Sequence, residues 1–183
     1  MEHKIVWSAD SGIGQGLLAW HAKLSKDRGT RAMLRRCASL DEAVLSPAYQ
    51  RFYRYMLACG WPDNAADRQN DKLAVIAVLV AMLKHADDEG DEEEDEDKDS
   101  HERNLPYRMS EKKFDRPLVS EMRFRTLLKI DSTDELLTGL RRVLPLIKSK
   151  TSVLHLANDV YWWGDKTKKE WAYAYRWPLK ASA

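Results

Sequence analysis

The feature that most restricts the fold is an unbroken run of eleven apolar residues, Leu73–Leu83. A membrane-spanning helix needs about 20 such residues, so this run is too short to cross a bilayer. As part of a helix over Asp67–Lys84, the run is apolar on nearly every side. Such a helix has to be surrounded by other elements. The run therefore predicts the central helix of a bundle.

Apolar residues recur at helical spacing in several other segments, and no segment alternates with a period of two. Ser46 and Pro47 predict the start of a helix that ends near Gly60. Ser132 and Glu135 form a capping-box pattern before another helix, which Pro145 should kink or end. These patterns predict an all-α protein without strands. The expected helices cover residues 13–24, 28–36, 47–57, 67–84, 118–130, 133–147 with the kink or end at Pro145, 153–160 and 165–177.

The segment Asp87–Asp99 holds eleven acidic residues and one lysine. A block of like charges cannot bury enough apolar surface to offset the entropy lost on ordering, so we expect it to be disordered. It divides the chain into an N-terminal helical lobe (residues 1–86), an acidic flexible linker (87–104) and a C-terminal helical bundle (105–183).

The acidic segment also conceals a strongly basic remainder. The whole chain carries a formal charge of +1, but without residues 87–99 it has 29 Lys and Arg against 18 Asp and Glu, a net charge of +11. An asymmetry of this kind indicates nucleic acid or another polyanion as a partner.

Signatures of catalysis and of cofactors are weak. The five histidines lack metal-ligand spacing, and the two cysteines, Cys37 and Cys59, fit small core residues of a reducing cytosol. Gly12, Gly14 and Gly16 resemble a nucleotide loop only loosely, since no strand precedes them. We therefore predict a cytoplasmic protein that is not an enzyme, holds no metal or cofactor and does not bind a membrane.

Arginines cluster on the polar faces of the expected helices. Arginine pairs with phosphate through two parallel hydrogen bonds, which lysine cannot do. The plainer interpretation is that exposed helix faces are normally charged. The aromatic residues near the C-terminus are expected in the core or at a subunit interface, although stacking on bases is an alternative. The candidate nucleic-acid-binding residues are Arg31, Arg35, Arg36, Arg51, Arg54, Arg123, Arg125, Lys129, Arg141 and Arg142.

An ordered set of local patterns over residues 18–170 resembles the CasB family, the small subunit of the type I-E CRISPR Cascade complex. Each pattern is weak alone, but their order and spacing are fairly specific. The matching pieces are Ala19-Trp20 with Leu24, Leu34-Arg35-Arg36, Ser120-Glu121-Met122-Arg123-Phe124 with Leu127-Leu128-Lys129 and Asp131, Leu140-Arg141-Arg142, and Trp162-Trp163-Gly164.

The resemblance implies an all-helical, non-catalytic subunit that sits as a pair in a guide-RNA complex. It would contact the large subunit, the backbone subunits and a second copy of itself, and hold target and displaced non-target DNA. Two features depart from the family pattern, the acidic stretch and the basic Arg125. The resemblance implies nucleic-acid contacts for Arg35, Arg36, Arg123, Lys129, Arg141 and Arg142, whereas Arg31, Arg51, Arg54 and Arg125 rest on helical geometry alone.

The expected function is sequence-independent DNA binding that stabilises an R-loop in antiviral defence. The alternative is a protein–protein scaffold whose basic face docks acidic partners without touching DNA. A weaker alternative is a nuclease that uses the acidic run to hold metal, which requires ordered carboxylates.

Overall fold

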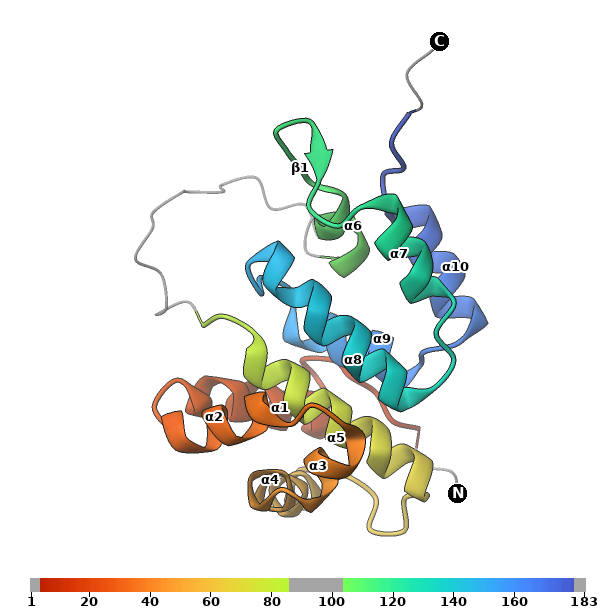
Figure 1. The fold of residues 1–183 in the computed structure, drawn as a ribbon. Coiled ribbons are helices and arrows are strands. Elements are labelled where there is room, and N and C mark those ends of the chain that lie inside the picture. The colour runs from red at the N-terminus through yellow and green to blue at the C-terminus, as the bar shows by residue number, and fades with distance from the viewer. Residues whose placement is uncertain (1–3, 86–103, 180–183) are drawn as a thin grey trace.

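The computed structural model describes residues 4–85 and 104–179 and is all-α apart from one short hairpin (Figure 1). The expected acidic linker falls almost wholly outside the described residues. Among residues 4–85 and 104–179, none of the helices combines the length and the apolar character that a membrane span requires. The helices are α1 (Gly12–Leu24), α2 (Arg28–Arg36), α3 (Leu40–Leu45), α4 (Pro47–Ala58), α5 (Asp67–Met82), α6 (Leu105–Ser110), α7 (Glu121–Leu128), α8 (Thr133–Val143), the 3₁₀-helix η2 (Leu144–Ile147), α9 (Val153–Tyr161) and α10 (Asp165–Ala174).

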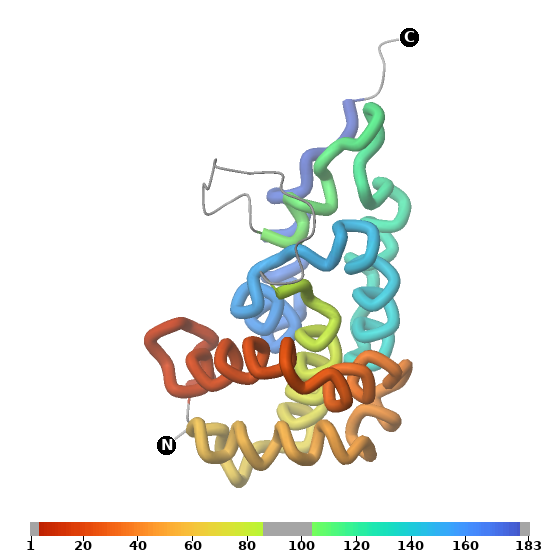
Figure 2. Tube along the Cα trace, turned by 90° about the vertical axis from the view of Figure 1, so that its left-hand side faces the viewer, coloured from red at the N-terminus to blue at the C-terminus, as the bar shows by residue number. Residues whose placement is uncertain are grey.

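Helix α5 is the centre of the fold, as its sequence predicts. Every residue from Leu73 to Ala81 is fully buried. The helix packs against α2, α3 and α4 of the N-terminal half and against α8 and α9 of the C-terminal half. Figure 2 shows the N-terminal helices at the bottom, the C-terminal elements above them, and α5 running between the two groups. The buried residues of both halves therefore form one continuous core.

Polar contacts also join the two halves. The backbone amide of Leu40 donates to Asp134 Oδ1 over 2.7 Å. Tyr161 receives two further donors, from Gln69 Nε2 to its hydroxyl (2.8 Å) and from Lys72 Nζ to its backbone oxygen (2.6 Å). The division of the chain into two lobes, at residues 86 and 105, stays a prediction. The buried residues of the two lobes form a single core.

The helix ends follow the expected capping chemistry. Ser46 Oγ accepts a hydrogen bond from the amide of Tyr49, and Ser132 Oγ accepts one from the amide of Glu135 over 3.0 Å. Gly60 follows α4 with a φ of +104°, a conformation that glycine adopts readily. At Pro145, α8 gives way to the 3₁₀-helix. These starts and stops confirm the local predictions.

Two local expectations were wrong, and two short helices were not expected. Helices α3 and α6 have six residues each, which is too short for a periodic pattern to stand out. Strands Lys112–Lys113 (β1) and Arg116–Pro117 (β2) form a hairpin where no strand was expected. Helix α7 begins at Glu121, because the preceding residues 118 and 119 pair instead with the backbone oxygens of residues 111 and 109.

The cysteines and the C-terminal aromatics also fit the core only in part. Cys37 is buried and Cys59 is half-buried, and both are free thiols. Among the aromatics, Trp171 and Tyr175 are buried, whereas other rings lie at the surface. Core packing therefore explains some of this cluster, and the exposed members are Trp162, Tyr173 and Trp177.

Candidate nucleic-acid interface

A groove of about 920 Å³ runs between α7 and α8. Its floor is apolar and is formed in part by Leu127, Ile130 and Val143. Arg123, Lys129 and Arg142, all predicted site residues, line it and are exposed. Two acids, Asp134 and Glu135, line it as well, so the groove carries both positive and negative charge with a small excess of cations.

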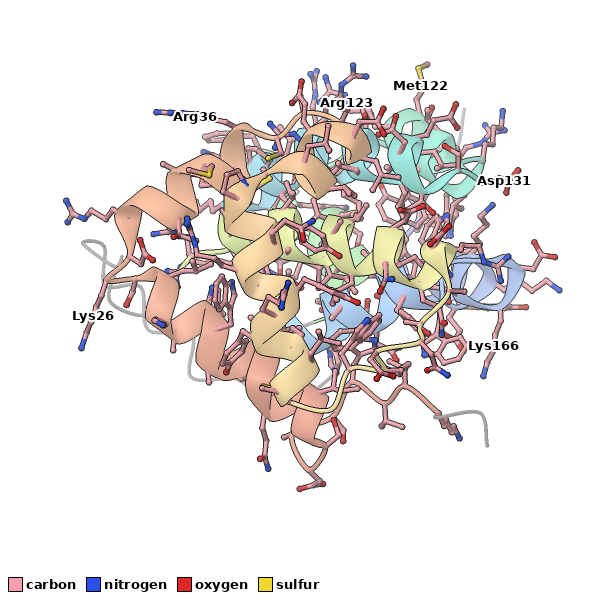
Figure 3. The ribbon with its side chains drawn as sticks, turned by 90° about the horizontal axis from the view of Figure 1, so that it is seen from below. Lys26, Arg36, Met122, Arg123, Asp131 and Lys166 are labelled. Carbon is pink, nitrogen blue, oxygen red and sulfur yellow. The ribbon has the colours of Figure 1, made fainter. Side chains whose placement is uncertain are left out.

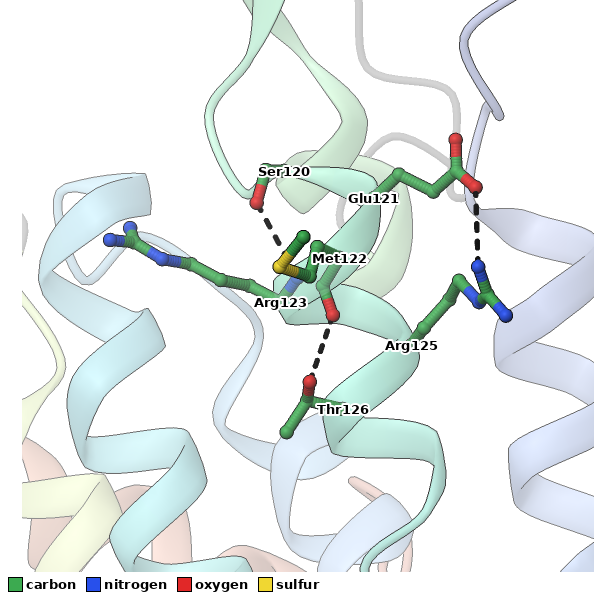
Figure 4. A network of polar contacts seen from close by, with 6 residues as sticks. All are labelled: Ser120, Glu121, Met122, Arg123, Arg125 and Thr126. Atoms are coloured by element: carbon green, nitrogen blue, oxygen red, sulfur yellow. Dashed lines mark hydrogen bonds and ion pairs between the residues drawn. The ribbon is translucent and has the colours of Figure 1, made fainter.

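Local capping and packing set the orientation of α7. Ser120 Oγ accepts a hydrogen bond from the Arg123 amide, and Thr126 Oγ1 donates to the Met122 backbone oxygen over 2.9 Å (Figure 4). The opposite side of the helix is held by Phe124, which is fully buried and stacks on Tyr175 with ring centroids 4.0 Å apart. This anchoring turns Arg123 toward the groove.

Arg125 does not join this group. It lies on the other side of α7 from Arg123, as Figure 4 shows, because residues two apart on a helix are separated by about 200°. Its Nη1 lies 4.0 Å from Glu121 Oε1, in an exposed pair one helical turn apart. Arg125 therefore does not line the α7–α8 groove with Arg123 and Lys129, and a DNA contact for it stays a prediction.

A second basic depression, of about 470 Å³, lies where the two halves of the chain meet. We call it the junction pocket. It is lined by four cations from distant segments, and none of its described lining residues is acidic. A backbone hydrogen bond from Lys84 N to Ser149 O, 3.1 Å long, joins the two sides. The lining residues are Arg31, Arg35, Met82, Lys84, Pro145, Lys148 and Ser149.

Arg31 has a structural task in this pocket. Its Nε donates to Ala81 O over 3.2 Å, and its Nη2 donates to Leu83 O over 3.1 Å. Carbonyl groups at the end of a helix lack partners within the helix, so this guanidinium caps the C-terminal end of α5. Arg31 is half-buried as a result. Helical spacing placed Arg31 on a basic face but could not reveal this contact.

Arg141 is also held within the protein. Its Nη1 donates to the backbone oxygen of Arg35 over 2.8 Å, which joins α8 to α2. The neighbouring Arg142 is exposed and lines the α7–α8 groove. Of the two neighbours, Arg141 therefore makes a contact within the chain, and Arg142 is available at the surface.

The remaining predicted residues are exposed. Arg36, at the end of α2, projects from the same side of the molecule as Arg123 in the view of Figure 3. Arg51 and Arg54 lie on α4, away from both basic depressions. Arg51 lines a smaller depression, together with Asp27. The structure thus brings part of the predicted set together and leaves Arg51 and Arg54 apart.

Two cations of the junction pocket were missed by sequence reasoning. Lys84 follows the end of α5, and Lys148 follows η2 with a left-handed φ of 57°. Neither belongs to a helical stripe, so spacing gave no signal for them. The only sequence signal for these two lysines was their position just beyond a helix end. That signal is not specific for a binding site, because lysine is common there through its favourable interaction with the helix dipole.

The described residues offer little for catalysis. They contain no group of three or more His, Cys, Asp or Glu side chains arranged to hold a metal ion. Burial raises the pKa of Asp159 to about 6, but this carboxylate accepts a hydrogen bond from Trp171 Nε1 over 3.0 Å between α9 and α10. Its surroundings are those of a structural contact.

A comparison with known families gives the family of the chain. Residues 30–175 match the model of the family described as CRISPR-associated protein Cse2. The chain belongs to the Cse2 family. Cse2 proteins are the CasB subunits of the Cascade complex and are not known as enzymes, so this Cse2 chain is a subunit of a multi-subunit CRISPR assembly. No curated protein and no solved structure gives a significant match to the chain.

Proposed function

We propose that this Cse2 protein binds DNA without regard to sequence, through the junction pocket and the α7–α8 groove, and stabilises the R-loop by holding the displaced non-target strand. The observation that carries this proposal is the junction pocket, in which four cations converge without an acid among the described lining residues. Cations gathered in a concavity attract the phosphate backbone and carry no information about base sequence.

The energetics of R-loop formation suit such a role. The RNA–DNA hybrid that forms is about as stable as the DNA duplex that it replaces. Contacts from protein to the backbone of the displaced strand can therefore shift the balance toward the open state. Binding of this kind should weaken steeply as salt rises, because each phosphate contact releases condensed counterions.

The partners in this proposal are the large and backbone subunits of the complex with their guide RNA, target and non-target DNA, and a second copy of this chain. The protein would act in the cytoplasm. The N-terminal lobe would contribute Arg31, Arg35 and Lys84 to the DNA path, and the C-terminal bundle would contribute Lys148 and the groove.

One observation favours a second function for the α7–α8 groove. Its floor is apolar, and Met122 beside it is 78% exposed. Apolar surface rimmed by charge is typical of protein docking sites. In this alternative the groove receives a protein segment of the complex, and its arginines contact acidic residues there.

A variant complex distinguishes the two functions. Arg123, Lys129 and Arg142 are replaced together by alanine, and a control variant loses the same charge at Lys26, Lys166 and Lys169, which are exposed elsewhere. Assembly is measured by size-exclusion chromatography and strand displacement by permanganate reactivity of thymines. DNA binding predicts normal assembly with reduced displacement. Failure of the groove variant alone to assemble would support docking instead.

A further inference from the structure

The hairpin between α6 and α7 combines cations with an exposed aromatic ring. Lys113 pairs with Arg116, and Lys112 pairs with Pro117, which leaves Phe114 and Asp115 as a two-residue turn. Residues 112–116 are all exposed. In Figure 1 the hairpin projects beyond α6 and α7, away from the core. It presents three cations and one acid.

The turn holds Phe114 in an unfavourable backbone conformation. Phe114 and Asp115 have φ values of 52° and 61°. Two positive φ angles in a two-residue loop define the type I′ turn, for which Asn, Asp and Gly are preferred. Asp115 fits this preference, whereas a bulky side chain at positive φ is rare. Strain of this kind is typical of residues kept for function.

The Phe114 side chain is 89% exposed, so burial of its ring does not offset the backbone strain. Nζ of the neighbouring Lys113 lies 5.6 Å from the centroid of the ring. The ring is therefore available as a flat apolar surface beside a cation. Stability does not explain a phenylalanine at this position.

The base of the hairpin is firmly attached to the protein. Leu118 N donates to Glu111 O over 2.8 Å, and Val119 N donates to Met109 O over 2.9 Å. Val119 is fully buried, and its oxygen accepts a bond of 2.7 Å from the Tyr175 hydroxyl. A projection with a fixed base loses little entropy on binding, so the tip is pre-organised for a ligand.

We propose that the Phe114 ring stacks on a base of single-stranded nucleic acid, while Lys112, Lys113 and Arg116 bind the phosphates on either side of it. Every base has a π-face, so stacking on an aromatic ring tolerates any sequence. The excess of cations around the ring favours a polyanion over an apolar pocket of a protein. This inference rests on the proposed function, which brings a displaced single strand to the molecule.

The position of the hairpin agrees with such a strand. The hairpin leads through Ser120 directly into α7, as Figure 4 shows, and Arg123 on that helix lines the α7–α8 groove. A strand whose phosphates lie along the groove therefore has the Phe114 ring at one end of its path. Phosphate binding and base stacking would act on the same strand.

Two substitutions at the tip separate the ring from the turn. Phe114→Asn removes the ring and places a residue favoured at positive φ, so the hairpin is kept. Phe114→Tyr keeps an aromatic ring. Tyr173→Ala is the control, because Tyr173 is an aromatic residue that is 92% exposed on α10. Thermal melting checks that each full-length variant is folded.

The probes are a single-stranded DNA of about 20 nucleotides, an abasic strand of the same length, and a duplex. Phe114→Asn should weaken binding of the normal strand about tenfold, which corresponds to the loss of one modest stacking contact. Binding of the abasic strand and of the duplex should not change, because their phosphates remain. Phe114→Tyr and Tyr173→Ala should both bind like the parent protein.

Several results would overturn the stacking site. The parent protein could bind normal and abasic strands with equal affinity, or Phe114→Asn could bind the normal strand as tightly as the parent protein does. Phe114→Asn could also lose the same affinity for the normal and the abasic strand. Failure of Phe114→Asn to join the complex, with normal DNA binding, would instead show that the ring enters a protein pocket. Failure of the proposed function would give a different result: the parent protein would bind neither the duplex nor the abasic strand.

Discussion

Nη1 of Arg141 lies 2.8 Å from the backbone oxygen of Arg35 and donates a hydrogen bond to it. Arg35 lines the junction pocket, and Arg142, the next residue after Arg141, lines the α7–α8 groove. The bond therefore lies between the two basic depressions and fixes the end of α2 against α8. Arg141 of the basic set thus makes a contact within the chain, whereas its neighbour Arg142 is exposed.

The first prediction concerns the contribution of this hydrogen bond to stability. Arg141→Ala should lower the free energy of unfolding by about 1 kcal/mol, the usual net value of a hydrogen bond. Arg142→Ala removes the same charge from an exposed site and should change it by less than ~0.5 kcal/mol. Urea unfolding of the two variants gives the comparison. Equal stability of the two variants would show that the bond to Arg35 contributes nothing.

The second prediction concerns the two lysines that sequence reasoning missed. Replacing Lys84 and Lys148 together by glutamine should weaken duplex binding and reduce the slope of log affinity against log salt by about 1.8, or 0.9 for each lost phosphate contact. Lys166 and Lys169 replaced by glutamine form the control, since both are exposed on α10. Titrations at several salt concentrations measure both slopes. The same slope in both double variants would exclude the junction pocket as a DNA site.

The third prediction is a pH dependence that arises from Asp159. Burial raises its pKa in the folded protein to about 6, from a usual value of 3.8. The folded state thus favours the protonated carboxyl, which stabilises the protein fully below pH 3.8, and this contribution is lost as pH rises through 6. Each pKa unit is worth about 1.4 kcal/mol, so the loss should be on the order of 2 to 3 kcal/mol.

Asp159→Asn should remove this dependence. The amide oxygen can still accept the bond from Trp171, and it does not ionise. Chemical unfolding between pH 4 and pH 8 should therefore show a flatter stability profile for the variant and higher stability at pH 7. Glu170→Gln is the matched control, because the charge of Glu170 contributes to the raised pKa of Asp159. This control should lower that pKa and keep the pH dependence in weaker form.

The fourth prediction concerns the acidic segment 87–99, which lies outside the described residues. Its eleven carboxylates are tethered close in sequence to Lys84, and tethering of this kind corresponds to an effective concentration of order mM. We expect the segment to compete with DNA for the basic surface. Replacing its acids by serine and glycine at constant length should raise DNA affinity several-fold at low salt, with little change at high salt.

A constant-length replacement keeps the connection between the two halves, so altered folding does not imitate altered charge. Unchanged DNA affinity at low salt would leave the segment with only the role of a solubilising connector. Fluorescence anisotropy with a labelled duplex at two salt concentrations is sufficient to distinguish these outcomes.

Local chemistry in the sequence predicted most of the helices. Ser46 and Ser132 mark helix starts, and Pro145 marks a helix end. Each acts on residues only a few positions away, so its effect can be predicted from the sequence alone. The apolar run of α5 predicted its burial for the same reason. The hairpin at Phe114 was missed because its turn contains a residue that the turn type disfavours.

The candidate site was harder to predict, since it depends on distant segments. Arg31 contacts oxygens 50 and 52 positions away, and Arg141 contacts one 106 positions away. Helical spacing placed both on charged faces but could not show that these faces meet another part of the chain. Lys84 and Lys148 line one pocket where Lys84 N bonds to Ser149 O, a contact between segments far apart in the sequence.

The burial of Leu73–Ala81 in α5 has a consequence for synthesis of the chain. The helix ends at Met82, whereas α9, which packs against it, begins at Val153, roughly 70 residues later. At 5–20 residues per second, a ribosome takes roughly 4 to 14 s to make that stretch. For that time the nascent chain carries a strongly apolar helix with part of its surface uncovered. The eleven carboxylates of residues 87–99 emerge next, and we expect their mutual repulsion to limit aggregation of the unfinished protein.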